Sequence, residues 1–389
     1  MSAFDPQAAT AAYMSTLDAA ELELARDYTT GNHWLILGGI IVAALVAWIV
    51  VRSRVLDRID TKLSRRGFVL TTFLIAAAYL FLSGVLTLPW SIYTDWWREA
   101  QYGRTSQPLG DFLSQGGISL VITSLLGGLL VVGIYALIRK AGRFWWLWSG
   151  GLVAAFAAFM LLLSPVLIEP LFNDFQPIPE GEVRDGVLAL AEEAGVPADR
   201  VFMYDGSRQS NNFTANVAGV GSSARIAISD VALDEASLDE VLAVTGHEIG
   251  HYTLGHVWRL LAVAGGLALL AFWLTDRLYP RVARWFGTDA ALSDPRGLPV
   301  FVFLIGLVFT LAQPVSNAVT RMGEREADAY SLRTANLPDG LASALIKTAE
   351  YRYPLAGPLE EALFYTHPSV ERRIRSAMEW KAANMPASE

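Results

Sequence analysis

The sequence predicts a mainly α-helical membrane protein of about six transmembrane helices, joined to a small α+β domain. Three observations support this fold class. Hydrophobic residues make up 53% of the 389 residues and charged residues only 17%, which is too apolar for an ordinary soluble domain. Six long stretches contain no charged residue at all. Between the fourth and fifth stretches, the pattern changes to that of short strands and amphipathic helices.

The six uncharged stretches are the predicted membrane spans. A helix needs roughly 20 apolar residues to cross about 30 Å of hydrocarbon, and most of the stretches reach that length. The fifth is short, so a buried helix of the soluble domain is an alternative for it. The stretches are residues 34–51, 67–94, 112–138, 144–168, 260–275 and 297–320.

These spans divide the chain into five parts. We expect an acidic N-terminal tail (1–33), four transmembrane helices (34–168), a soluble α+β insert (169–257), two transmembrane helices (258–320) and a C-terminal helical part (321–389). The tail lacks the basic start and apolar core of a cleavable signal peptide.

Composition also limits the chemistry. The chain has no cysteine, so a transition-metal site must use His, Asp or Glu. The net charge of −8 gives no reason to expect a nucleic-acid partner.

The soluble insert reads as one helix (183–194) followed by three strands (201–204, 212–217 and 224–229). The strand NFTANV at 212–217 alternates polar and apolar side chains. If it is an edge strand, its free amides and carbonyls can pair with an extended peptide. An ordinary internal strand is the alternative.

A helix with capping-box spacing at its start, Ser237 to Glu240, leads into TGHEIGHYTLGH (245–256), which holds three of the five histidines. His247 and His251 are four residues apart, which is about 40° of rotation and about 6 Å of rise, so both imidazoles point the same way. This spacing suits two ligands of one zinc ion, with Glu248 placed to take a proton from its bound water. A polar helix face with coincidental spacing is the alternative.

A catalytic zinc ion needs a third protein ligand. His256 lies one residue too early for the histidine-rich protease pattern, and Leu254 holds that pattern's glycine position. We therefore expect His256 to support a ligand or to end the helix.

GEREAD, just after the sixth span, offers a carboxylate as the third ligand. Glu324 and Asp328 share one helical face, so Glu324 can bind the metal while Asp328 orients an imidazole. Glu326 is expected to point away and to stay solvated. The alternative is a surface salt-bridge helix with Arg321 and Arg325.

These motifs resemble the integral-membrane, zinc-dependent CAAX prenyl endopeptidases of the gluzincin group. HEIGHYTLGH, the E-x-x-x-D helix and THPSVERRI match that family, and further matching segments follow in the same order, so that the resemblance covers residues 34–380. Those segments lie at 88–103, 170–185, 206–219 and 343–347.

The resemblance implies a ring of tilted helices around a water-filled chamber, closed at one end by the zinc domain. It implies one Zn²⁺ held by His247, His251 and Glu324, with Glu248 catalytic and Asp328 beside the ligands. It also implies His367 and Arg373 near the reaction centre, and a substrate-binding strand edge at Ser210, Asn211, Asn212 and Phe213. Asn212 stands where the family has alanine, so the substrate preference at this edge is expected to differ from the family's. The eukaryotic members have seven spans, and the first is not found here.

The predicted function is therefore a membrane-embedded zinc metalloendopeptidase. It would hydrolyse extended peptides, including lipidated or membrane-tethered ones, by a zinc-activated water with Glu248 as general base. His367, Tyr365 or Arg373 would help to stabilise the oxyanion. The expected partners are a peptide or protein substrate and the lipid bilayer, and we expect a monomer.

Other classes of function remain open. One is a quality-control protease that does not act on prenylated substrates, and another is a catalytically silent zinc-binding scaffold or transporter. A transporter usually buries ionisable residues in its spans, and the six stretches contain none. A protease that cleaves inside the bilayer is disfavoured, because acidic residues open the histidine helix.

We expect a multi-pass protein of a bacterial inner (plasma) membrane. Its orientation is ambiguous. Loops 52–67, 139–143 and 276–296 are rich in Lys and Arg, which by the positive-inside rule places the zinc domain outside the cytoplasm. The family resemblance indicates the reverse.

Overall fold

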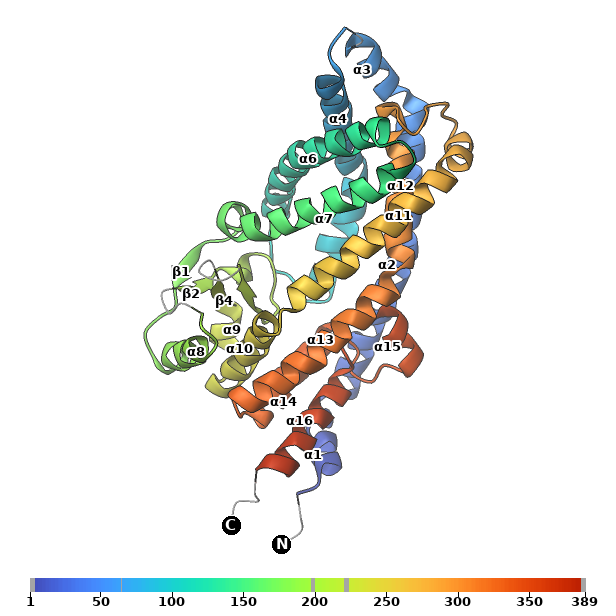
Figure 1. The fold of residues 1–389 in the computed structure, drawn as a ribbon. Coiled ribbons are helices and arrows are strands. Elements are labelled where there is room, and N and C mark those ends of the chain that lie inside the picture. Colours follow the sequence, from blue (N-terminus) through green and yellow to red (C-terminus); the bar gives the residue numbers. More distant parts are fainter. Residues whose placement is uncertain (1–3, 64, 197–199, 220–223, 386–389) are drawn as a thin grey trace.

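The long apolar helices gather at one end of the molecule, and the sheet, most of the shorter helices, and the first and last helices of the chain lie at the other (Figure 1). The computed structural model describes residues 4–63, 65–196, 200–219 and 224–385. Among these residues, five helices are long and apolar enough to span a membrane. They are α2 (Ala19–Ser53), α4 (Phe68–Ser91, continued by η1 and α5 to Gln101), α6 (Leu109–Lys140), α7 (Trp145–Leu163, continued by η3 and η4 to Leu171) and α11 (His256–Phe286).

The sixth predicted span is a broken one. It consists of α12 (Leu298–Leu311) and α13 (Gln313–Thr334), which are bent by 49°. Pro314 lies in the first turn of α13, where it cannot donate the backbone hydrogen bond that would continue α12. Helix α13 packs on α10 (Leu238–Thr253) and α15 (Pro358–Phe364) of the α+β domain. The described residues therefore form five membrane-capable helices, or six when the bent pair is counted as one span, and the prediction of about six spans is confirmed.

The short fifth stretch is part of a 31-residue helix, α11. Residues on both sides of the uncharged run extend the helix to full membrane length, and α11 packs along α7 and α12. The structure therefore supports a membrane span here rather than a buried helix of the soluble domain.

The N-terminal segment is helical and packed, whereas we expected a tail. α1 (Pro6–Met14) starts at the Asp5 cap, and Asp18 forms a capping box with Glu21 at the start of α2. Tyr13 donates a hydrogen bond of 2.9 Å to Asp339, and the helix packs on the hydrophobic cluster of the last helices. The N-terminus is thus part of the C-terminal domain.

The α+β domain contains a four-stranded sheet in the order β1-β2-β4-β3. The strands are β1 (Phe175–Pro177), β2 (Val201–Tyr204), β3 (Ala215–Ala218) and β4 (Arg225–Ser229), and only the β2–β4 pair is parallel. Within the described residues β3 pairs on one side only, so the edge strand is confirmed, although it begins three residues later than predicted.

Helices complete the domain. They are α8 (Glu182–Glu193), α9 (Asp230–Glu235), α10 (Leu238–Thr253), α14 (Pro338–Lys347), α15 (Pro358–Phe364) and α16 (Val370–Asn384). Helix α10 packs against β3, and α9 packs against β4. The short helix α3 (Val55–Leu63) lies at the opposite end of the molecule (Figure 1).

Because both termini lie at the same end, we expect an even number of membrane crossings (Figure 1). The chain has no native cysteine, so single cysteines can be labelled from one side of the membrane without background. Exposed Ser15→Cys and Ser376→Cys should react with an impermeant maleimide from the same side, and Thr61→Cys on α3 from the opposite side. Labelling of Ser15→Cys and Ser376→Cys from different sides would contradict this arrangement.

Candidate metal centre

The histidine helix α10 is fixed at its start. Both hydrogen bonds of the Ser237–Glu240 capping box are present. The buried Glu240 carboxylate also accepts hydrogen bonds from Ser343 (2.6 Å) and Lys347 (2.8 Å) of α14. These contacts hold α10 against the C-terminal helices.

Two glycines let α13 approach α10 closely. A Cβ at Gly250 would lie 3.2 Å from the Ala327 backbone, and one at Gly246 would lie 3.1 Å from Ser331. Ser331 also donates a hydrogen bond of 2.6 Å to the Ala243 carbonyl oxygen. The glycine before each motif histidine therefore explains how an acidic residue of α13 reaches the imidazoles.

Two imidazoles and one carboxylate converge. Ligand atoms of His247, His251 and Glu324 all lie within 4.8 Å of one another. The two Nε2 atoms are 3.1 Å apart, and each lies 3.3 Å from an oxygen of Glu324. Ligands of a tetrahedral zinc ion are separated by a similar distance, roughly 3.3–3.6 Å.

This group fits a divalent metal ion. Glu324 Oε2 is buried and makes no hydrogen bond, although a buried carboxylate oxygen needs a partner. Two neutral imidazoles and one carboxylate form a donor set that zinc commonly uses. A cation at this point would satisfy the oxygen.

Asp328 orients His247. Its Oδ1 lies 2.8 Å from His247 Nδ1, and Arg373 holds the same carboxylate through two nitrogens at 2.6 and 2.8 Å. Burial lowers the pKa of His247, but the contact with Asp328 and the Glu324 carboxylate 3.3 Å from its Nε2 outweigh burial and raise the pKa to about 10. An incoming metal ion must therefore displace a proton from this imidazole.

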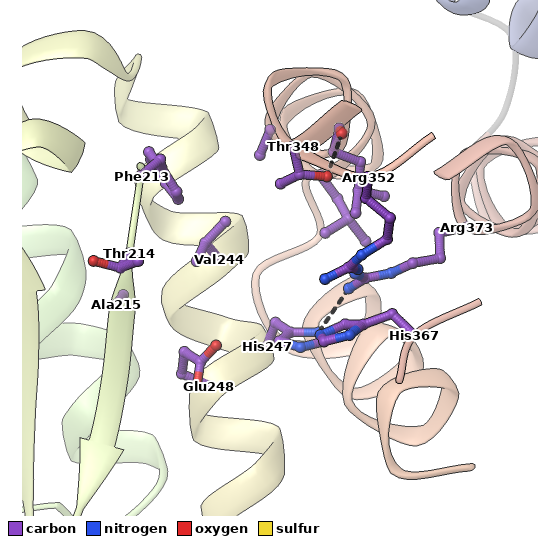
Figure 2. A pocket seen from close by; sticks show the side chains of 13 residues that line it. Phe213, Thr214, Ala215, Val244, His247, Glu248, Thr348, Arg352, His367 and Arg373 are labelled. Carbon is purple, nitrogen blue, oxygen red and sulfur yellow. Dashed lines mark hydrogen bonds between the residues drawn. The ribbon is translucent and has the colours of Figure 1, made fainter. Parts of the chain in front are cut away.

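Glu248 faces a cavity of ≈ 230 Å³ beside these ligands (Figure 2). Its carboxyl is half-buried, and burial raises its pKa above the ordinary value. The edge strand and the residues before it form one wall, and α14 and the C-terminal segment form the other. The lining includes Phe213, Thr214, Ala215, Val244, Leu341, Leu345, Arg352, His367 and Arg373.

The C-terminal segment brings His367 to the candidate metal ligands. His367 Nε2 lies 3.1 Å from Glu324 Oε2, and Thr366 lies 2.8 Å from its Nδ1. Burial and then the nearby Arg352 hold the pKa of His367 well below its usual value, so the imidazole is neutral. Tyr365, in contrast, donates its hydroxyl to the Tyr353 carbonyl oxygen at 3.0 Å and does not line the cavity.

Of the four residues predicted to bind substrate, one lines the cavity and three contact a neighbouring loop. Phe213 lines the cavity. The other three hold the 103–106 loop: Asn211 donates to the Arg104 and Gly103 carbonyl oxygens at 2.9 Å each, and Arg104 donates to Asn212 Oδ1 at 3.1 Å. Ser210 Oγ lies 3.4 Å from the Arg104 carbonyl oxygen. These contacts delay the start of β3 and leave Phe213 to Ala215 facing the site.

The helical position of Glu326 predicted a solvated charge, but the structure gives its carboxylate two partners. It accepts hydrogen bonds from Arg259 (2.9 Å) and pairs with His256 Nε2 (2.9 Å). Both partners, His256 and Arg259, lie in the first turn of α11. The turn between α10 and α11 is what places them next to Glu326 on α13. His256 Nδ1 lies 2.8 Å from Nδ1 of His251, and His256 is also the first residue of α11.

Comparison with known proteins adds independent findings. Residues 177–381 match the family model of peptidase family M48, and residues 6–174 match that of the CAAX prenyl protease N-terminal region with five membrane helices. The chain is 28% identical over 371 residues to the uncharacterized metalloprotease YhfN of Bacillus subtilis, covering 93% of this chain and 87% of that protein.

Eukaryotic proteins are similar as well. The chain is 30% identical over 313 residues to CAAX prenyl protease 1 homolog of Arabidopsis thaliana, covering 76% of this chain and 72% of that protein. The crystal structure of S. mikatae Ste24p has the same fold, with a TM-score of 0.67 and 24% identity over 78% of this chain and 76% of that one.

Proposed function

The chain belongs to peptidase family M48 and is a membrane metalloprotease of the CAAX prenyl protease type. On this basis, we propose that it cleaves extended peptides at a zinc site formed by His247, His251 and Glu324. The observation that supports the site most directly is the convergence of these three side chains within 4.8 Å around a buried carboxylate oxygen that makes no hydrogen bond.

Glu248 is the proposed general base. When bound, the metal supplies the Lewis acidity that amide hydrolysis needs. Glu248 takes the proton of the attacking water and returns it to the leaving amine. Its raised pKa suits both steps, because a carboxyl that titrates nearer to neutrality accepts and releases a proton more readily at working pH.

His367 and Arg373 are the proposed helpers at the carbonyl. Both line the cavity beside Glu248, and Thr366 can fix the His367 tautomer that carries hydrogen on Nε2. From there His367 can donate to the negative charge that develops on the carbonyl oxygen. Arg373 contributes positive charge while its hydrogen bonds hold Asp328.

An extended peptide fits the cavity as substrate. The edge from Phe213 to Ala215 offers backbone groups for β-addition, which recognises peptide largely independently of its sequence. Apolar side chains of α10 and α14 form the facing wall. The similarity to CAAX prenyl proteases supports a lipidated or membrane-tethered peptide as substrate. The similarity to a metalloprotease of Bacillus subtilis supports a bacterial plasma membrane as the location, where we propose that the protein acts as a monomer.

Metal removal tests this function. We expect the purified full chain to cleave fluorogenic peptides, to lose this activity in o-phenanthroline, and to regain it with one equivalent of Zn²⁺. The same peptide with and without a farnesyl group shows whether the lipid contributes to kcat/KM. A zinc-loaded protein that cleaves none of the peptides would instead indicate a silent scaffold.

A further inference from the structure

We propose that His256 and Glu326 form a positioning relay for the metal ligand His251, so that a partly exposed carboxylate of α13, beside the start of the membrane helix α11, contributes to how tightly the metal is held. This inference rests on the proposed metal site. It assigns a role to two residues that neither bind the ion nor line the cavity.

Hydrogen bonds connect the relay in sequence. His251 Nδ1 lies 2.8 Å from His256 Nδ1, and His256 Nε2 lies 2.9 Å from Glu326 Oε2. If His251 uses Nε2 for the metal, its Nδ1 carries the hydrogen and donates it to His256 Nδ1. His256 must then carry its own hydrogen on Nε2, where the Glu326 carboxylate accepts it. A metal at the site and a carboxylate at the far end therefore select the same tautomers.

The turn between α10 and α11 makes this contact possible. In a continuous helix, His256 would lie five residues after His251 and about 140° around the axis, too far for their rings to meet. The chain instead leaves α10 after Thr253 and turns at Gly255, whose φ of 67° places it in the left-handed region that favours glycine. His256 then begins α11 with its ring against His251.

The relay is enclosed except at its outer end. His256 is only 4% exposed, and a Cβ at Gly323 would lie 3.2 Å from its Nδ1, so that glycine leaves the room the ring occupies. Glu326 has a side-chain exposure of 44% and is held by Arg259, which is also on α11. The outer end therefore joins α11 and α13 at the surface.

The two ligand histidines thus have different supports. His247 contacts a buried carboxylate, Asp328, directly, whereas His251 contacts a carboxylate only through a second imidazole. Partners of this kind fix the orientation of a ligand ring and increase its basicity, and their loss typically costs 10–100-fold in metal affinity. We expect the His256 relay to contribute within that range.

Metal affinity, measured by competition with a chromophoric chelator, tests the relay. His256→Ala should weaken Zn²⁺ binding by roughly 10–100-fold and should shift the visible spectrum of the Co²⁺-loaded protein, because the ring of His251 is no longer held. His256→Asn places an oxygen acceptor where Nδ1 lies but has no group at the position of Nε2, so it should bind more tightly than His256→Ala and less tightly than wild type. Glu326→Ala should weaken binding, and the double variant with His256→Ala should weaken it no further than His256→Ala alone.

Arg325→Gln, next to Glu326 and exposed, is the matched control and should leave affinity unchanged. A His256→Ala protein with wild-type affinity and a wild-type Co²⁺ spectrum would overturn the relay, as would a His256→Asn protein no tighter than His256→Ala. A wild-type chain that binds no metal, or a His247→Ala variant that binds as tightly as wild type, would instead overturn the proposed metal site.

Discussion

Glu248→Gln is expected to lower kcat for peptide cleavage by roughly 10²–10⁴-fold, the range that general acid–base catalysis contributes. The amide has almost the shape of the carboxylate but cannot take the proton of the attacking water. Glu248 lines the cavity beside His247 and is not a member of the converging ligand group, so bound metal should stay at one equivalent. Turnover of a fluorogenic peptide and metal content of the same sample are the two measurements.

Asp239→Asn is the control for this variant. Asp239 is exposed in the first turn of the same helix, α10, and the substitution changes charge in the same way far from the ligands. It should keep full activity. A Glu248→Gln enzyme that cleaves at the wild-type rate would remove Glu248 from the mechanism, whereas loss of metal along with activity would show that Glu248 supports the ligand group instead.

Local spacing predicted the part of the site that lies within single helices. His247, His251 and Glu248 follow from one helical turn, and Glu324 and Asp328 from another, because residues four apart share a face wherever the helix is placed. The spacing within each helix did not predict that α10 and α13 pack against each other. Gly246 and Gly250 make the approach possible, yet glycine in a helix predicts no specific neighbour.

Residues that depend on the path of the chain between elements were harder to predict. His367 and Arg373 reach the ligands from a separate C-terminal segment, so family resemblance rather than spacing indicated them. Glu326 was placed in solvent by its helical position, because the turn at Gly255 that brings His256 to it is a tertiary feature. The packed N-terminal helix was missed for a similar reason, since its contacts lie on α14 and α16 at the far end of the sequence.

Glu324→Ala is expected to abolish both metal retention and cleavage. The carboxylate is the one ligand from outside α10, and without it two imidazoles of one helical turn remain to hold the ion. The variant should lose metal on dialysis, and excess Zn²⁺ should restore little activity. Affinity should fall by more than the 10–100-fold expected for Asp328→Asn, which removes only the support of His247 and leaves all three ligands in place.

Comparing the metal affinity lost in the two variants distinguishes a metal ligand from a residue that orients a ligand. If Glu324 binds the metal, its removal should cost more affinity than removal of Asp328. Without metal, the Glu324 carboxylate still lies 3.3 Å from Nε2 of both His247 and His251, so thermal unfolding in the presence of chelator measures what these contacts contribute to the metal-free fold. A Glu324→Ala protein that unfolds early without metal would mean that the carboxylate is needed by the fold, while one that keeps its zinc would show that the third ligand is a different residue.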